Sequence, residues 1–327
     1  MRFNSVLVSN TISTGPSLVA SVSDMSSDSS SALIQLKVLL TTIAIAAIPS
    51  IALYCQKNLL MTPWLYRALW VGAFLINVVT VSIPGRFDGQ TDSAGKVIFP
   101  WRTLFEPSGW AFAIWGVIYS AELLVSAYAG AIGTPVSALQ RAVPYWLAGN
   151  LFQSLWCYCF RPQFKRYLWL PTSCLALAAL SLGLGHNALT IAIDSVHVGS
   201  RLPLLLIRFP FALHTGWLAA ATLLNLNGWS VLSDQSLPVQ ISIAYMSAYI
   251  GAAVGVALSI RSGDPFLGLT VAWALLAVSV RTNEKLGEKP LLADADTQRS
   301  LSMTERTLSI FVGMISIGAA ALPKSMF

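Results

Sequence analysis

The sequence predicts an all-α integral membrane protein, built from about eight or nine apolar helices that cross the bilayer. Only 10% of the 327 residues are charged, whereas 55% are hydrophobic. A soluble domain carries about 25% charged residues, because its surface must stay hydrated. The apolar residues also occur in blocks long enough for a helix to cross about 30 Å of hydrocarbon. Membrane lipids are therefore the surroundings that we expect for most of the surface.

Nine apolar blocks define the predicted spans. Their approximate limits are 33–55, 67–84, 108–130, 143–160, 167–186, 204–227, 239–260, 265–281 and 307–323. The net charge of +6 does not indicate nucleic-acid binding, because the basic residues lie in short loops and form no patch with exposed aromatic residues. Their excess on one set of alternate loops predicts a cytoplasmic N-terminus. The sequence does not indicate which cellular membrane holds the protein.

The two ends of the chain extend beyond a central group of helices. We expect residues 1–31, which contain eleven Ser, to be disordered, and 32–66 to hold an extra membrane span and a linker. After the central part, 231–281 would add two membrane spans and 282–306 a charged linker. Residues 307–327 are a candidate for a last span.

The loop 85–107 is long for a connection between two spans and has mixed charge. It is more typical of a lid or a re-entrant loop than of a plain connector. Its Trp101 fits the membrane interface, where Trp is favoured.

The helix predicted around 108–130 carries an aromatic stripe that ends in a carboxylate. Phe112, Trp115, Tyr119 and Glu122 follow the spacing i, i+3, i+7 and i+10, so they share one helix face. A charged side chain within a span costs about 2.5–3.5 kcal/mol on insertion scales, so it usually faces the interior of the bundle. Glu122 is therefore either a pocket residue or a structural hydrogen-bond partner.

A second stripe lies in the predicted helix 204–227. His214, Trp217, Ala221 and either Leu224 or Asn225 follow one another at intervals of three or four residues. The small Ala221 either leaves room for a flat ligand or allows another helix to pack closely. Arg208, one turn before the stripe, is a candidate partner for Glu122.

We expect Pro210 to break or kink the start of this second helix. In the span 143–160, Asn150 begins a weakly polar stripe that fits hydrogen bonding between helices. The span 239–260 carries Ser247, Gly251, Gly255 and Ser259 at four-residue spacing. Such small residues allow close helix packing, either inside the chain or in a homodimer.

Signs of catalysis and of metal binding are weak. The four cysteines form no CxxC pair, and the three histidines are dispersed. There is no HExxH, GxSxG or Walker motif. We therefore expect no metal and no required cofactor, and we lean against an enzyme. However, Trp115, Trp156 and Trp217 lie inside predicted spans, and interior Trp residues suit a pocket for a flat, apolar ligand.

Three segments resemble the tryptophan-rich sensory protein family (TspO/MBR, peripheral benzodiazepine receptor-like), in its larger, divergent branch. The family's pattern in its second helix is matched by Pro107, Trp110, Phe112, Trp115 and Tyr119. Its third-helix pattern is similar to Asn150, Trp156, Tyr158 and Phe160, and its fifth-helix pattern to Trp217, Ala221, Thr222, Leu224 and Asn225. The resemblance covers residues 67–230, which would form a TspO-like five-helix domain with additional helices at both ends.

The resemblance implies a pocket between the helices, capped by the loop 85–107, with Trp110, Trp217 and Ala221 in its wall. It also implies a receptor or carrier for a flat lipophilic ligand, such as a porphyrin, a haem or a sterol-like molecule. Our own stripe argument adds Phe112, Trp115, Tyr119, His214 and Asn225 to the ligand-binding candidates. The intramembrane polar candidates are Glu122, Asn150 and Arg208.

Two other functions remain open from the sequence. The first is an intramembrane enzyme acting on a pigment, an isoprenoid or a lipid, with Glu122, Tyr119 and His214 as acid or base. The second is a multi-span transporter of small molecules, in which the helices after residue 230 are essential.

Overall fold

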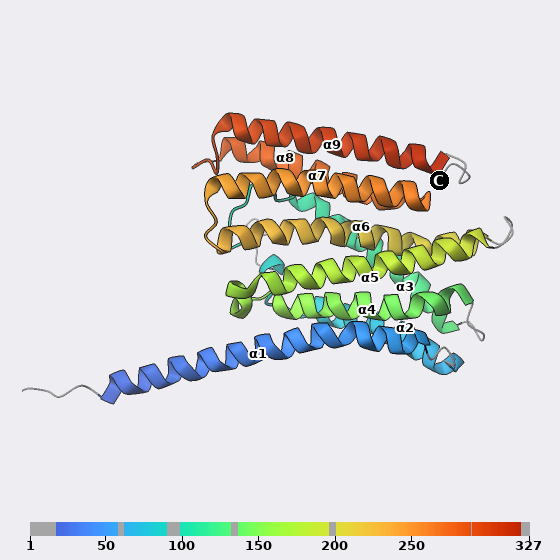
Figure 1. Ribbon diagram of the computed structural model, residues 1–327, viewed down its shortest axis with the longest axis horizontal. Coiled ribbons are helices and arrows are strands. Elements are labelled where there is room, and N and C mark those ends of the chain that lie inside the picture. The colour runs from blue at the N-terminus through green and yellow to red at the C-terminus, as the bar shows by residue number, and fades with distance from the viewer. Residues whose placement is uncertain are drawn as a thin grey trace, which may run out of the picture.

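A computed structural model describes residues 18–57, 62–89, 99–131, 137–195, 201–288 and 290–321. These residues form nine long helices and short 3-10 turns, without a strand, which confirms the predicted all-α class. The helices are α1 (Leu18–Lys57), α2 (Pro63–Ser82), α3 (Ile114–Ala131), α4 (Ser137–Cys159), α5 (Trp169–Asp194), α6 (Arg201–Leu232), α7 (Leu237–Ser262), α8 (Pro265–Glu284) and α9 (Ala295–Ala321). They lie side by side and run nearly parallel to one another (Figure 1).

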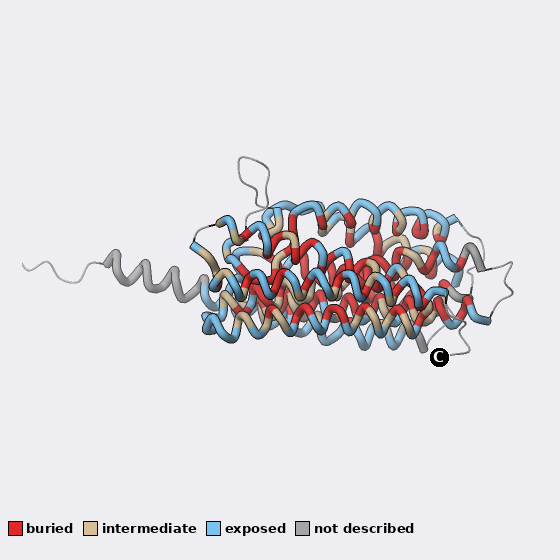
Figure 2. Tube along the Cα trace, turned by 90° about the horizontal axis from the view of Figure 1, so that it is seen from above, coloured by how far each residue is buried: buried red, intermediate tan, exposed pale blue. Residues whose placement is uncertain are grey.

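Seven of the helices are long and apolar enough to cross a membrane, namely those that contain Ser31–Tyr54, Pro63–Ser82, Gly109–Ala131, Trp169–Asp194, Leu204–Leu232, Leu237–Ser262 and Pro265–Gly287. The chain is therefore a multi-pass integral membrane protein. Helices α4 and α9 do not meet the same criterion, so their crossing of the bilayer stays a prediction. Buried residues gather between the helices and exposed ones on the outer faces (Figure 2). Many of the exposed residues are large and apolar, such as Leu124, Leu206 and Ile317, and they suit contact with lipid.

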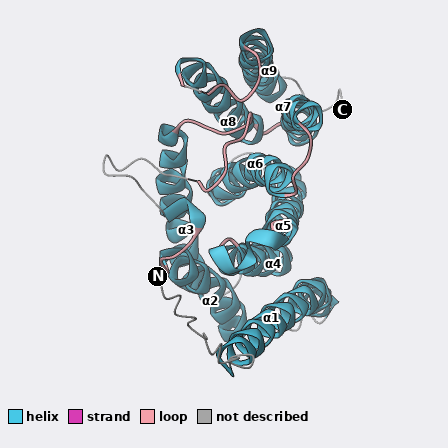
Figure 3. Ribbon diagram, turned by 90° about the vertical axis from the view of Figure 1, so that its left-hand side faces the viewer, coloured by secondary structure: helices cyan, strands magenta, loops and turns pink. Residues whose placement is uncertain are grey.

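Five helices enclose the centre of the molecule. In the view along the bundle, α2, α3, α6, α5 and α4 follow one another around a ring (Figure 3), and each contacts the next, with α4 closing on α2. Trp70 of α2 stacks on Trp146 of α4 with ring centroids 5.0 Å apart. Between α5 and α6, a side chain at Gly185 would collide with Phe211, so this glycine permits close approach. Such packing fixes the positions of the side chains that face inwards.

Helices α7, α8 and α9 pack against one another outside the ring, and α7 and α8 also pack against α6. The small-residue stripe of α7 lies at these contacts. Gly251 faces Leu223 of α6, Gly255 faces Val312 of α9, and Ser259 hydrogen-bonds to Ser316 at 3.1 Å. The stripe therefore serves packing inside the chain. A homodimer, if it forms, needs another surface.

The turn between α7 and α8 follows from two residues. Gly263 has φ 62°, a left-handed conformation that ends α7 at low cost because glycine has no Cβ. Asp264 then accepts a hydrogen bond from the backbone N–H of Phe266 at 3.0 Å and caps α8. By contrast, Pro210 does not break α6, which is continuous from Arg201 to Leu232. Neighbouring groups in a bundle tolerate a proline in a membrane helix.

Helix α1 packs on α4 and on the turn Pro162–Tyr167. It begins at Leu18, inside the Ser-rich segment for which we expected disorder, and residues 1–17 lie outside the described part of the chain. Residues 90–98 of the loop 85–107 and 322–327 at the C-terminus also lie outside it.

Candidate functional site: an aromatic cavity in the helix ring

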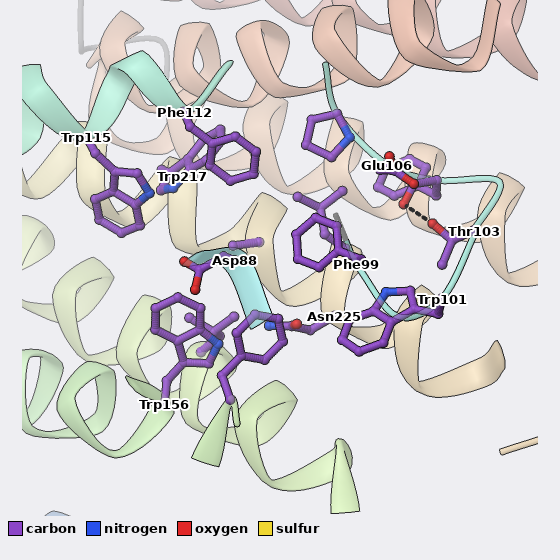
Figure 4. A pocket seen from close by; sticks show the side chains of 16 residues that line it. Asp88, Phe99, Trp101, Thr103, Glu106, Phe112, Trp115, Trp156, Trp217 and Asn225 are labelled. Carbon is purple, nitrogen blue, oxygen red and sulfur yellow. Dashed lines mark hydrogen bonds between the residues drawn. The ribbon is translucent and has the colours of Figure 1, made fainter. Parts of the chain in front are cut away.

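The ring encloses a cavity near one end, and residues 99–107 close it. The cavity between the lining side chains has a volume of about 70 Å³. Half of the sixteen lining residues are aromatic. The lining consists of Asp88, Phe99, Trp101, Thr103, Phe105, Glu106, Pro107, Phe112, Trp115, Trp156, Phe160, Leu175, Trp217, Ala221, Leu224 and Asn225 (Figure 4).

One wall of the cavity comes from the start of α3 and from α6. Phe112 lies on the short 3-10 turn Gly109–Ala113, which leads directly into α3. Its ring meets the Trp217 indole edge to face, with centroids 5.7 Å apart, and Trp115 meets the same indole at 6.0 Å. Ala221 and Asn225 follow Trp217 at successive turns of α6, as the predicted stripe requires. Because the side chain of Ala221 is small, it leaves free space in front of this wall.

The opposite wall belongs to α4. Trp156 faces the Trp115 side of the cavity, and Asp88 lies between the two walls (Figure 4). Trp156 stacks on Phe160 one turn later, with centroids 5.2 Å apart. The structure thus brings all three interior tryptophans, Trp115, Trp156 and Trp217, to one cavity. All three had been candidates for a ligand pocket because they lie inside predicted spans.

A second, more polar compartment adjoins the first and shares Asp88, Phe112, Trp115 and Trp156 with it. Its volume is about 420 Å³. Its further lining residues are Val81, Arg86, Gly109, Gly116, Tyr119 and Gln153. The combined cavity is therefore aromatic at one end and hydrogen-bonding at the other.

The polar side chains of this compartment are held in place by one another. Tyr119 donates to Oδ1 of Asn77 at 2.7 Å and accepts from Gln153 at 3.1 Å, while Asn77 donates to Gln153 at 2.8 Å. This closed triangle joins α2, α3 and α4 and leaves the phenol facing the compartment. Since each member is buried or half-buried and partnered, the triangle is a rigid part of the wall.

Arg86 and Asp88 form an ion pair in the loop after α2, with Nε 2.8 Å from Oδ1. Burial disfavours the charged guanidinium, but the hydrogen bond and the charge of Asp88 outweigh it and raise the pKa of Arg86. Arg86 also lies over the Trp156 ring, 5.5 Å from its centroid. This end of the cavity therefore offers a neutral ion pair and an aromatic face.

Glu122 and His214 lie behind the aromatic wall and do not line either compartment. Nδ1 of His214 is 2.6 Å from Oε1 of Glu122, and both side chains are fully buried. The imidazole also contacts the Trp115 ring, at 5.5 Å between centroids. The predicted partner of Glu122 was Arg208, and that prediction is wrong. Arg208 instead pairs with Asp264 at 2.9 Å, because it points towards the α7–α8 turn.

Two further candidates lie away from the cavity. Trp110 is 41% exposed and packs edge to face on Trp273 of α8 at 4.6 Å. It does not line the cavity, because residues 109–113 form a 3-10 turn whose Trp110 faces α8 instead of the ring interior. Asn150 is buried, and its carbonyl accepts hydrogen bonds from Asn77 and Ser154. It thus supports the contact between α2 and α4.

Several lining residues were not predicted individually. Asp88 and the residues Phe99, Thr103, Phe105 and Glu106 come from the loop 85–107, which we expected to act as a lid. Its described part does cover the cavity. A loop has no periodicity from which inward-facing positions could be chosen, so sequence could mark the loop but not these residues.

Comparison with known proteins agrees with this architecture. A family model described as TSPO-like protein matches residues 63–318, more than three quarters of the chain. The match runs past residue 230, where the sequence resemblance ended, and reaches into α9. It does not test the predicted division of the chain into domains. No curated protein and no solved structure matches the chain. The chain belongs to the TSPO-like family.

Proposed function

We propose that this protein is a membrane receptor or carrier that binds a flat lipophilic ligand in the aromatic cavity, and that the ligand is a tetrapyrrole or a sterol-like molecule. The observation that carries the proposal is the wall formed by Phe112, Trp115 and Trp217, in which the small Ala221 leaves room for a ligand. Aromatic walls of this kind provide a large contact area for a flat ring system.

The polar compartment supports an amphipathic ligand. Tyr119, Gln153 and the Arg86–Asp88 pair lie beyond the tryptophans and can hydrogen-bond to a polar substituent. A tetrapyrrole has such substituents on one edge of a flat ring, and a sterol has one at the end of a flat body. Between these two ligands we favour the tetrapyrrole, as the sequence resemblance implies.

The geometry offers less support to the enzyme alternative. Of its three candidate acid and base residues, only Tyr119 reaches the cavity. Glu122 and His214 are fully buried behind Trp115 and hydrogen-bond to each other. A transporter remains compatible with the fold, because α7 and α8 pack directly on α6 and α9 packs on both of them.

Binding is tested by quenching of tryptophan fluorescence when protoporphyrin IX is added to the purified protein in detergent. Trp217→Ala removes an indole from the cavity wall and should weaken binding at least tenfold. Trp110→Ala removes the same side chain from a site outside the cavity and should leave the affinity within twofold. Thermal unfolding of both variants shows whether each still folds.

Saturable quenching that Trp217→Ala weakens and Trp110→Ala does not would support a tetrapyrrole in this cavity. If the two variants behave alike, the cavity is not the binding site. If protoporphyrin IX does not quench at all, the same titration with a fluorescent sterol tests the other ligand class.

A further inference from the structure

The strap that closes the cavity, residues 99–108, is attached at two places. Phe99 and Trp101 pack on Phe160 at the end of α4, whereas residues 102–108 are bonded to α8 and to the turn after it. Glu106 lies between two cations of α8 and the turn after it: its Oε1 is 3.2 Å from Nε of Arg281, and its Oε2 is 2.9 Å from Nζ of Lys285. Lys285 also donates to the carbonyl of Thr103 at 2.6 Å. One carboxylate of the cavity lining is thus fixed by helices outside the ring.

The backbone of the strap is attached to the same helix. Thr282 donates to the carbonyl of Leu104 at 3.2 Å, and the N–H of Ser108 donates to the carbonyl of Ala277 at 3.0 Å. At the rim, Arg102 contacts Glu288 at 3.3 Å. The attachment therefore extends along about two turns of α8 and the 3-10 turn Lys285–Gly287.

Lys285 makes this attachment strong. Its side chain is 2% exposed, and an ammonium group removed from water needs a counter-charge. Glu106 supplies that charge from the strap. The Glu288 carboxylate reaches the neighbouring Arg281 at 2.6 Å, and the Glu288 backbone N–H donates to the Lys285 carbonyl at 3.1 Å. If the strap lifts, Lys285 loses the carboxylate and the Thr103 carbonyl together.

We propose that Glu106, Arg281 and Lys285 form a latch, and that its opening is the step that lets a ligand into or out of the cavity. The part of this proposal that concerns a ligand rests on the proposed function. Because α8 packs against both α7 and α9, the additional helices control access to the ring. Glu106 belongs both to the latch and to the cavity lining, so a ligand in the cavity lies directly against the latch.

Ser108→Cys reports the latch without any ligand. Ser108 is 4% exposed and its hydroxyl has no hydrogen-bond partner in the described residues, so a thiol replaces it with little change. The four native cysteines are first replaced by alanine. The rate of labelling by a water-soluble maleimide then measures how often the strap leaves α8. A second reporter, Ser126→Cys, lies buried in α3 and measures opening of the whole fold.

Glu106→Gln should raise the labelling rate of the Ser108→Cys reporter at least tenfold, while the Ser126→Cys reporter stays protected. Glu284→Gln is the matched control, because Glu284 contacts Arg281 at 3.5 Å but does not touch the strap; it should change the rate less than twofold. The double variant Glu106→Gln, Lys285→Met removes the buried unpaired charge as well. It should show the same strap release even if the single variant folds poorly.

Labelling of Ser108→Cys that stays unchanged in both Glu106 variants would overturn the latch, and so would equal labelling of the two reporters. The release rate of bound protoporphyrin IX should also rise at least tenfold in Glu106→Gln. If no variant binds porphyrin, the proposed ligand is wrong, and the labelling result still decides the latch.

Discussion

Glu122 and His214 join α3 to α6 through a hydrogen bond of 2.6 Å between two fully buried side chains. The contact between these helices closes the ring on one side of the cavity. It also lies directly behind Trp115, whose indole meets the imidazole edge to face. We infer that this pair fixes the position of the Trp115 side chain in the cavity wall, although the pair does not itself line the cavity.

Glu122→Ala is expected to lower the stability of the protein by about 1–3 kcal/mol, because it leaves the buried His214 without its partner. Glu122→Gln keeps a hydrogen-bonding group and should cost less. Leu123→Ala, at a lipid-facing position of the same helix, is the control. Thermal unfolding in detergent measures the three effects. A Glu122→Ala variant as stable as the control would contradict the structural role of the pair.

A substitution in the same pair distinguishes the receptor hypothesis from the enzyme hypothesis. If the protein is a receptor, Glu122→Gln should retain ligand affinity within about threefold, since the residue lies outside the lining. An intramembrane enzyme would instead bind its substrate normally and lose turnover in this variant. The test combines the porphyrin titration with a chromatographic assay for conversion of the bound ligand.

Much of the fold could be predicted from the sequence, because lipid imposes a simple rule on helix length and polarity. All nine predicted spans fall within or largely overlap described helices. The stripe of Trp217, Ala221 and Asn225 also lies on one side of α6, as helix periodicity requires. The face on which a residue lies within one helix depends only on its spacing along the chain, so the sequence predicts it directly.

Contacts between helices could not be predicted in the same way. Arg208 was a plausible partner for Glu122, but pairing depends on the rotation of α6 against its neighbours, and His214 lies closer on the same helix. Trp110 shares the sequence pattern of the cavity residues, yet a 3-10 turn directs it to Trp273. The latch of Glu106 and Lys285 joins positions 179 residues apart, for which a single sequence carries no signal.

Ala221→Phe should abolish or strongly weaken ligand binding, by at least tenfold, while leaving the helix ring intact. The larger side chain fills the space that Ala221 leaves in the cavity and removes no existing contact. Leu206→Phe places the same side chain on the outer face of α6, where Leu206 is 63% exposed, and should not affect binding. Quenching titrations of both variants make the comparison. Normal binding by Ala221→Phe would exclude this wall as the ligand site.

Asp264 is expected to stabilise the protein at neutral pH and to lose this effect in acid. Burial would raise the pKa of its carboxyl, but the hydrogen bond with His186 and the charge of Arg208 offset that effect and hold the pKa below its ordinary value. A carboxyl with a depressed folded pKa contributes its stability above the unfolded pKa of about 3.9, and loses it as the pH falls through the folded value.

Asp264→Asn should therefore lower the stability by about 3–5 kcal/mol at pH 7, since Arg208 would remain buried without a counter-charge. The difference in unfolding temperature between parent and variant should be constant from pH 8 to about pH 5 and shrink only in more acidic buffer. A difference that already disappears near pH 6 would show that another group controls the cluster.

Gly268→Ala is expected to disrupt the packing of α7, α8 and α9. A Cβ at this position would overlap with Oγ of Ser316 and with Oγ of Ser259, and Ser259 Oγ accepts a hydrogen bond from the Gly268 N–H at 3.0 Å. The two hydroxyls can turn away only by giving up their hydrogen bonds, and the Gly255 carbonyl oxygen also lies 3.0 Å from the added Cβ. We therefore expect a loss of about 1–3 kcal/mol, the usual cost of overpacking. Gly318→Ala on α9 is the matched control, because nothing lies within 4 Å of its added Cβ. It should leave the stability unchanged or raise it by about 0.5–1 kcal/mol through better helix propensity. Thermal unfolding of the two variants measures this contrast.

Because α8 carries the latch, Gly268→Ala should also speed maleimide labelling of the Ser108→Cys reporter. Unaltered stability and labelling in this variant would mean that α8 does not pack closely on Ser259 and Ser316 at Gly268.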